Sequence, residues 1–220
     1  MFTFAIMNLI ETESELKKRW PYKYHWGQKQ NDLWDDMTNF IYHINSFEHL
    51  LNETGKTFTE IKQEFDRQDF FNYAANRWYN FLSAMAVEQI ICTVPGIEPA
   101  LNPHDRLVDF TIHGIKFDHK TTVFPEGFKR DVDYAVKNRK ELIEWLYANQ
   151  SQQKRKHLDN RLFIVVYSSD GKHWKLKAEI LWLKDIILNY ANNFNKNNLI
   201  RLKLKNNGEE TLSDIIWAIK

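Results

Sequence analysis

Hydrophobic positions in the first third of the chain recur with helical spacing. Across residues 31–52 and 69–92, apolar side chains return at intervals of three, four and seven, which is typical of helices that bury one face. Asn31 is suited to cap the first of these helices, and Gly55 is suited to end it. A short second helix can open at residues 57–60. This part of the chain is therefore predicted to be helical.

The middle of the chain changes to an alternating pattern. Residues 107–112 and 115–120 alternate between apolar and polar side chains around His113-Gly114, which predicts a β-hairpin with a tight turn. Residues 161–167 are almost continuously apolar, as expected for a strand buried on both faces. The remaining predicted elements are a helix over 130–149, a strand over 174–178, a helix that ends near Asn192, and strands over 199–204 and 215–219. The order predicts an α/β fold with a mixed sheet.

Composition narrows the class of protein. The 220 residues are 43% hydrophobic and 15% aromatic, which is enough for a packed core and excludes a disordered chain. We expect a helical extension over residues 1–68 and an α/β core over residues 69–220. The 30 Lys and Arg residues balance 29 Asp and Glu residues, so a general polycation that coats nucleic acid is not expected. A single cysteine, Cys92, excludes an internal disulfide and a Cys-based zinc site.

The apolar opening of the chain does not resemble a membrane anchor or a secretory signal. Residues 2–10 are apolar, whereas a membrane-spanning helix needs about 20 such residues. No basic residue precedes this run, and Glu11, Glu13 and Glu15 follow it. We therefore expect a cytoplasmic protein without a membrane partner.

Two carboxylates and a lysine gather in the predicted hairpin. Asp118 and Lys120 are two positions apart on one strand, so both side chains point to the same side of the sheet. Asp109 lies on the polar face of the partner strand, where pairing can bring it near Asp118. Paired carboxylate oxygens suit Mg²⁺, which readily accepts phosphate oxygens as well. A lysine beside such a site can position a metal-bound water or neutralise charge on a phosphate.

A third carboxylate precedes the hairpin. At about 100° per residue, Glu88 falls within the apolar stripe of the helix predicted over 69–92. A carboxylate in such a stripe is costly unless it is paired or bound to metal. The alternatives are a metal ligand, a salt bridge to a basic residue, and a helix rotated so that Glu88 reaches the edge of its contact.

The combination of Glu88 on a helix, Asp109, and Asp118-His119-Lys120 in a hairpin resembles the PD-(D/E)XK nuclease superfamily. The resemblance covers about residues 70–168, and Val108 stands where many members have proline. It implies a restriction-endonuclease-like core with a mixed β-sheet flanked by helices. It also implies that Asp109, Asp118, Glu88 and the backbone carbonyl of His119 bind the metal and that Lys120 is the catalytic lysine.

Three further residues are candidate contacts to the substrate. Lys116 shares the strand face of Asp118 and Lys120, and Gln150 and Arg155 lie near the predicted end of the helix over 130–149. In the nuclease interpretation they contact the nucleic acid. A solvated strand lysine and a solvated helix end with basic residues are equally open alternatives.

Together these features predict a Mg²⁺-dependent endonuclease, with Mn²⁺ as a substitute metal, that hydrolyses double-stranded DNA by a metal-activated water. The predicted activity is similar in kind to that of type II restriction enzymes or phage-defence nucleases. Cutting both strands needs two sites, so a homodimer is compatible with this function. Two other classes remain open: a non-catalytic nucleic-acid-binding or interaction module on the same fold, and a structural domain with an accidental motif.

Overall fold

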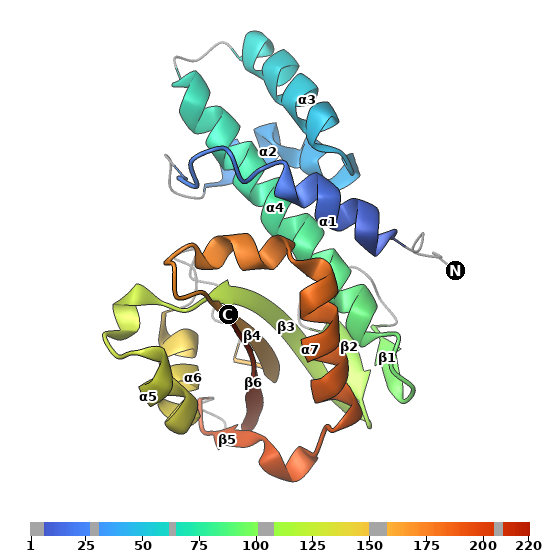
Figure 1. Ribbon diagram of the computed structural model, residues 1–220, viewed down its shortest axis with the longest axis vertical. Coiled ribbons are helices and arrows are strands. Elements are labelled where there is room, and N and C mark those ends of the chain that lie inside the picture. Colours follow the sequence, from blue (N-terminus) through green and yellow to red (C-terminus); the bar gives the residue numbers. More distant parts are fainter. Residues whose placement is uncertain (1–6, 27–30, 62–64, 101–107, 150–157, 205–208) are drawn as a thin grey trace. The chain divides into compact units, whose positions relative to one another are not determined.

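The computed structural model describes residues 7–26, 31–61, 65–100, 108–149, 158–204 and 209–220, and it divides into two compact units (Figure 1). The first unit comprises Met1–Ala86 with Lys177–Leu181, and the second comprises Val87–Leu176 with Trp182–Lys220. Helix α4 (Arg67–Ile91) contributes to both units. The first compact unit ends at Ala86 and the second begins at Val87, so the boundary between them lies within α4. The domain boundary predicted between residues 68 and 69 stays a prediction.

The first unit is helical, as predicted for this part of the chain. Besides α4 it contains α1 (Leu9–Lys17), α2 (Asp32–Met37), the 3₁₀ helix η1 (Asn39–His43) and α3 (Phe47–Glu60). The core of this unit is rich in aromatic side chains, among them Trp34, Phe70 and Tyr73. Asn31 caps α2, because its side chain accepts the backbone N–H of Trp34 at 2.9 Å. The predicted N-cap is confirmed.

The single helix predicted over residues 31–52 is wrong, because the chain breaks it into α2, η1 and α3. Thr38 ends α2, and its hydroxyl donates to the carbonyl of Trp34 at 2.6 Å. Ile44 is extended, and Ser46 then caps α3 by accepting the N–H of His49 at 3.3 Å. Polar caps therefore override a hydrophobic period that continues across them. Gly55, predicted to end a helix, lies inside α3.

The second unit is built on a six-stranded mixed sheet, so the predicted α/β class is confirmed at this level. Its spatial order is β1-β2-β3-β4-β6-β5. Pairing is antiparallel from β1 to β3, parallel from β3 through β4 to β6, and antiparallel between β5 and β6. The strands are β1 (Ile97–Pro99), β2 (Phe110–Ile112), β3 (Ile115–Val123), β4 (Arg161–Tyr167), β5 (Ile200–Leu202) and β6 (Thr211–Ile219).

The predicted hairpin is formed by β2 and β3. Ile112 pairs with Ile115, and the turn between them consists of His113 and Gly114 with φ values of 47° and 80°. Two successive residues with positive φ are the signature of a type I′ turn, whose twist matches that of antiparallel strands. The turn sets the register of the hairpin and therefore the positions of the polar side chains on it.

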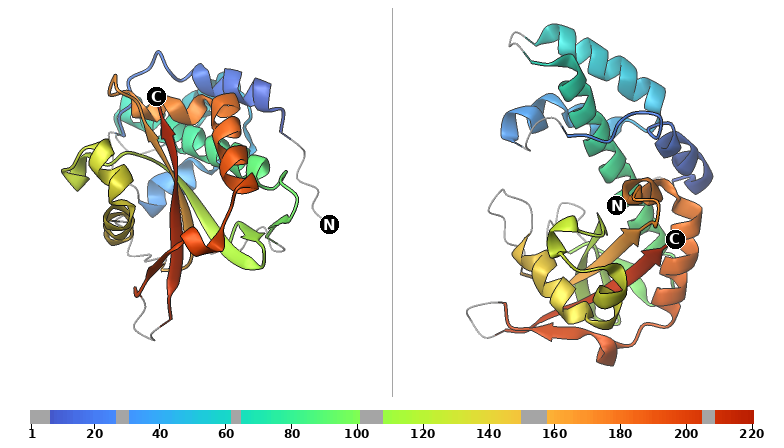
Figure 2. Two further views of the ribbon diagram at one scale, coloured as in Figure 1. Left: turned by 60° about the horizontal axis from the view of Figure 1, so that its bottom comes forward. Right: turned by 60° about the vertical axis from the view of Figure 1, so that its left-hand side comes forward.

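Helices cover both faces of the sheet (Figure 2). The crossover from β3 to the parallel strand β4 contains the 3₁₀ helix η2 (Glu126–Phe128), α5 (Val132–Lys137) and α6 (Arg139–Ala148). These helices pack on a core that includes Phe163, Val165 and Ile215. Helix α7 (Ile180–Asn192) lies on the opposite face, followed by the 3₁₀ helix η4 (Lys196–Asn198). The central strand β4 is buried over its first six residues, which explains its continuous apolar run.

The strand predicted over residues 174–178 is wrong. These residues belong to the 3₁₀ helix η3 (His173–Ala178). The alternation of lysine with apolar residues indicated a half-exposed strand, but Lys177 is buried and its Nζ donates to Asn80 Oδ1 at 3.0 Å. The pattern predicted that Lys177 faces the solvent. The residue can be buried because the Asn80 amide oxygen accepts a hydrogen bond from its ammonium group.

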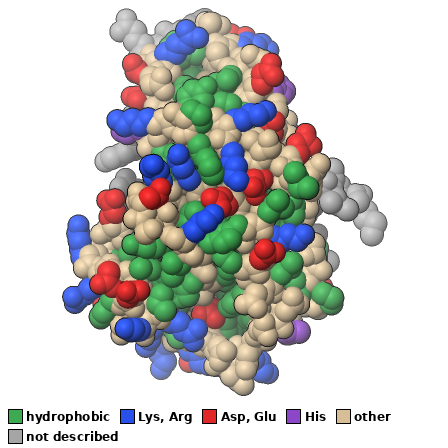
Figure 3. Space-filling view, in the orientation of Figure 1, with side chains coloured by type: hydrophobic (Ala, Val, Ile, Leu, Met, Phe, Trp, Pro, Cys, Tyr) green, Lys and Arg blue, Asp and Glu red, His purple; other side chains and the backbone are tan. Residues whose placement is uncertain are grey.

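The surface view reflects the balanced charge of the chain. On the face shown in Figure 3, basic and acidic side chains are interspersed and do not gather into one patch of a single sign. Within the described residues, no helix is both long enough and apolar enough to cross a bilayer.

Candidate metal centre

Three side chains that can bind a metal ion converge in the second unit. Glu88 lies in the last turns of α4, Asp109 directly precedes β2, and His119 lies in β3. One ligand atom from each of these residues lies within 4.8 Å of the other two. The antiparallel pairing of β2 with β3 places Asp109 beside the middle of β3. The end of one helix and a hairpin therefore form a cluster of two carboxylates and one imidazole.

Two hydrogen bonds to Asp109 fix the orientation of His119. Asp109 Oδ2 accepts the backbone N–H of His119 at 2.7 Å and lies 2.6 Å from its Nδ1. The His119 side chain is only 5% exposed, and its Nε2 is buried without a hydrogen-bond partner among the described residues. The Asp109 carboxylate therefore holds the imidazole ring in one orientation.

The donor set fits a divalent cation. Two carboxylates suit Mg²⁺ and Mn²⁺, and an imidazole shifts the preference toward Mn²⁺ and other transition metals. A metal site at these three residues is therefore chemically consistent with what the fold brings together.

The charges of the cluster shift the protonation of its members. Burial lowers the pKa of His119, but the hydrogen bond and charge of Asp109 raise it, so the net pKa lies above the ordinary value. Burial raises the pKa of Asp109, and the His119 contacts outweigh it, so the net pKa is lowered. The pKa of Glu88 is raised, mainly by burial, with Asp109 adding to the rise. Without a cation, a proton on His119 stabilises the carboxylates.

Asp118 forms an ion pair with Arg161 at the start of β4. The Arg161 Nε donates to Asp118 Oδ2. The Arg161 side chain is 6% exposed and the Asp118 side chain is 19% exposed. The Arg161 guanidinium also lies over the rings of Tyr147 and Phe163. Burial and the Asp109 charge raise the pKa of Asp118, while Arg161 counteracts them. Asp118 is therefore an electrostatic neighbour of Asp109 but has a cationic partner of its own.

Lys120 is an exposed residue of β3 whose side chain borders a pocket of about 230 Å³. Trp145, Asn149 and Phe163 also line this pocket, which places it on the face covered by α6. The surrounding protein and the Arg161 charge lower the pKa of Lys120, and the Asp118 carboxylate raises it. Because the residue is exposed, water weakens these effects.

The side-chain alternation of β3 separates the predicted residues. Successive side chains of a strand point to opposite faces, so Asp118 and Lys120 share one face and His119 lies on the other. Lys116 is exposed on the same strand, and its carbonyl accepts a hydrogen bond from Asn160 at 3.1 Å. The predicted substrate contacts Gln150 and Arg155 lie outside the described residues.

Two members of this constellation were not predicted from the sequence in the roles they have here. The family resemblance implied only the backbone carbonyl of His119 as a metal ligand, whereas its side chain joins Glu88 and Asp109. A signal was present, because His119 continues the apolar face of Ile115 and Phe117, where an imidazole needs a polar partner. Arg161 begins an apolar strand, and its pairing with Asp118 depends on the parallel register of β3 and β4.

Comparisons of the chain with protein-family models, with curated proteins and with solved structures found no match.

Proposed function

We propose that this protein is a metal-dependent endonuclease that hydrolyses phosphodiester bonds in double-stranded DNA, with a restriction-endonuclease-like core. The observation that carries the proposal is the cluster of Glu88, Asp109 and His119, which the end of α4 and the β2–β3 hairpin bring together. The succession of α4, β1, the β2–β3 hairpin, α6 and the buried strand β4 supports it, because the resemblance of the sequence implies this order.

Each residue has a role that follows from its surroundings. Glu88, Asp109 and the His119 side chain would hold the cation. A bound divalent cation would supply a water of lowered pKa and positive charge for the phosphate oxygens. Asp109 also orients the His119 ring through Nδ1.

The opposite face of β3 contributes positive charge. The pKa of Lys120 is lowered, mainly by the surrounding protein, and its exposure to water weakens this effect. As an ammonium, Lys120 can neutralise negative charge on a phosphate of the nucleic acid that reaches this face of the sheet. The Asp118 carboxylate interacts electrostatically both with Lys120, on its own face of β3, and with Asp109 of the metal cluster.

The test is cleavage of supercoiled plasmid and of mixed genomic DNA with Mg²⁺, with Mn²⁺ and with chelator. We expect metal-dependent cutting by the wild type and a rate at least about 100-fold lower for Lys120→Ala. Lys140→Ala removes an exposed lysine of α6 and serves as the matched control, with unchanged cutting expected. Equal cutting by the Lys120→Ala protein would refute the assignment of Lys120.

A non-catalytic nucleic-acid-binding module is the second candidate, and one observation favours it. The ion pair with Arg161 occupies Asp118, which the sequence pattern assigned to the metal. For such a module, the wild-type and Lys120→Ala proteins would bind DNA equally and neither would cut. Glu88→Gln separates the two functions further: it abolishes cutting by a nuclease and leaves the DNA affinity of a binding module unchanged.

A further inference from the structure

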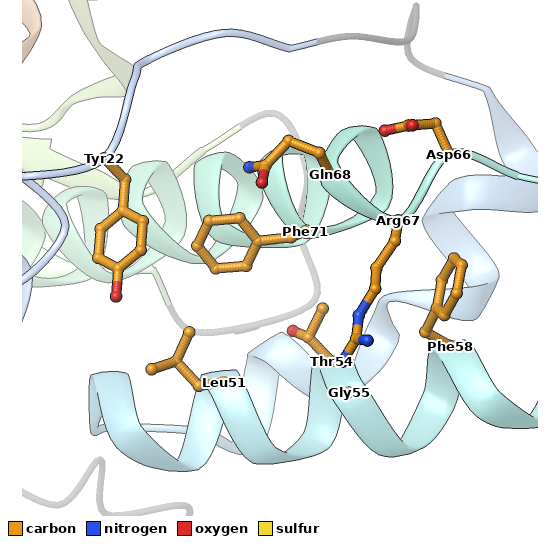
Figure 4. A pocket seen from close by; sticks show the side chains of 9 residues that line it. All are labelled: Tyr22, Leu51, Thr54, Gly55, Phe58, Asp66, Arg67, Gln68 and Phe71. Atoms are coloured by element: carbon orange, nitrogen blue, oxygen red, sulfur yellow. The ribbon is translucent and has the colours of Figure 1, made fainter.

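A second candidate site lies in the helical unit, in a pocket of about 470 Å³ between α3 and α4 (Figure 4). This volume is within the range of pockets that bind small organic molecules. The lining residues are Tyr22, Leu51, Thr54, Gly55, Phe58, Asp66, Arg67, Gln68 and Phe71. All of them belong to the first compact unit, so the pocket is separate from the candidate metal centre.

The walls of the pocket are suited to a flat ring. Tyr22 and Phe71 pack against each other with ring centroids 5.3 Å apart, and Phe58 lines the pocket from α3. Tyr22 and Leu51 are 38% and 37% exposed, so part of each apolar side chain faces the solvent at this pocket. Exposed aromatic and aliphatic side chains around one cavity indicate a binding surface.

Gly55 keeps the floor of this pocket open. It lies inside α3, where glycine is unfavourable for a helix, and a Cβ built on it would meet no atom within 4 Å. Any larger side chain at this position would project into the space between the lining residues. The glycine is therefore explained by the volume that it leaves free.

Polar groups occur at defined points of the same pocket. Thr54 is 5% exposed, and its hydroxyl is buried without a hydrogen-bond partner among the described residues. The Arg67 guanidinium lies over the Phe58 ring, 5.9 Å from its centroid, and reaches from α4 toward α3 (Figure 4). No ion pair joins Arg67 to a carboxylate within the described part of the chain. Gln68 adds an amide whose Nε2 donates to Asn72 Oδ1 at 3.3 Å and whose oxygen can accept a hydrogen bond.

We propose that this pocket binds the nucleobase of a nucleotide, with the phosphate at Arg67. Aromatic side chains stack on bases of any sequence, a buried hydroxyl and an amide match the polar edge of a base, and a guanidinium matches a phosphate. A free mononucleotide and an unpaired base in a DNA strand present the same chemistry. The site is independent of the proposed nuclease activity.

Binding is measured without metal, so that failure of the nuclease proposal does not affect the result. The probes are dAMP, dGMP, dCMP and TMP by calorimetry, with deoxyribose 5-phosphate as a probe that lacks a base. A short single-stranded oligonucleotide with a central 2-aminopurine reports stacking by fluorescence quenching. Binding of a mononucleotide identifies the free nucleotide as a ligand, and quenching of the oligonucleotide alone identifies a base within a strand.

Gly55→Leu is the decisive variant, because it fills the pocket without removing any contact and favours the helix. We expect the affinity for the probes to fall about tenfold or more while the melting temperature does not fall. Gly55→Ala, which adds only a Cβ in open space, is the matched control and should bind as the wild type does. Unchanged affinity in Gly55→Leu would overturn the proposal, as would the absence of binding for every probe.

Two more variants test the assigned contacts. Thr54→Val removes the buried hydroxyl at constant shape and should weaken binding about fivefold. Arg67→Gln should weaken binding of dAMP about tenfold and leave binding of deoxyadenosine unchanged, because only the former carries a phosphate. Binding of deoxyribose 5-phosphate as tight as that of the mononucleotides would overturn the assignment of a nucleobase.

Discussion

His119 is the residue on which the candidate metal centre depends. Its Nδ1 faces Asp109, its backbone N–H donates to the same carboxylate, and its Nε2 is left for a further partner. A ring held at two points has little freedom to turn away from a bound ion. In this cluster the two carboxylates provide the negative charge for a cation, and His119 provides a nitrogen ligand whose orientation is fixed.

The raised pKa of His119 predicts opposite effects of pH with and without metal. Without metal, a pKa above the ordinary value of 6.5 stabilises the fold at low pH, and this contribution is lost as pH rises through the raised pKa. With Mn²⁺, the cation competes with the proton, so the metal-induced rise in melting temperature should grow over the same pH range. Thermal denaturation with and without Mn²⁺ across a pH series measures both trends.

Variants identify the histidine responsible. His119→Gln should flatten both trends, because the titrating ring is gone. His49→Gln removes a histidine that is 55% exposed in α3 and should leave both trends unchanged. A metal-induced stabilisation that does not depend on pH in the wild type would argue against His119 as a ligand.

The ion pair between Asp118 and Arg161 predicts a large and asymmetric effect on stability. Arg161→Met leaves the largely buried Asp118 carboxylate without its cation, and we expect a loss of about 3 kcal/mol in the free energy of unfolding. The double variant Asp118→Asn, Arg161→Met should recover part of this loss. Urea denaturation gives the values.

An exposed pair of the same chemistry is the control for this prediction. Arg201 Nη1 lies 3.0 Å from Glu210 Oε2, and both side chains are well exposed. Arg201→Met should therefore cost less than about 1 kcal/mol. Equal losses in the free energy of unfolding for the two arginine substitutions would mean that Arg161 does not stabilise the buried Asp118 carboxylate.

At the scale of elements, the β2–β3 hairpin does most to bring the polar residues together. Its two-residue turn sets the register, and the register places Asp109 beside His119. A slip of one residue would move His119 to the face of α6 and Asp118 to the face of α7. The geometry of the candidate site thus depends on the backbone conformation of His113 and Gly114.

This dependence predicts opposite effects of one substitution at two glycines. Gly114→Ala places a Cβ on a residue with φ of 80° and should cost about 1 kcal/mol of unfolding free energy. Gly55→Ala lies within α3 and should gain about 0.5–1 kcal/mol. Chemical denaturation of both variants measures the pair, and stabilisation by Gly114→Ala would contradict a strained turn.

At the scale of the whole molecule, the two compact units separate the two candidate sites. The residues of the metal centre belong to the unit that contains the sheet, and the pocket of Figure 4 belongs to the helical unit. Each site is therefore open to a test that leaves the other intact.

Hydrogen exchange should show this separation directly. A bound metal ion suppresses openings that disrupt its ligands, so Mn²⁺ should slow exchange in β2, β3 and the last turns of α4. Amides of α3 should exchange at unchanged rates, and they are the internal control. Peptide-resolved mass spectrometry measures both. Uniform slowing over both units would mean that the ion binds elsewhere or that the units open together.

The sequence by itself predicts those features that depend on local patterns. Hydrophobic alternation and a turn dipeptide predicted the hairpin, a continuous apolar run predicted β4, and helical spacing predicted α4. The sequence also indicated Glu88 and Asp109 as candidate metal ligands, and the structure brings these two carboxylates together. Such features are local because neighbouring residues decide strand alternation, helix faces and turns.

Only the tertiary structure decided which polar groups become partners. Strand pairing and burial turned the His119 side chain toward Asp109, gave Asp118 the guanidinium of Arg161 and placed Lys177 against Asn80. Each of these pairs depends on the packing of a particular backbone arrangement. Asp118 and Arg161 are 43 positions apart, and Asn80 and Lys177 are 97 apart. Local propensity does not predict contacts between residues so far apart in the sequence. A buried charge needs a partner, and the tertiary fold decides which residue lies within hydrogen-bond distance of it.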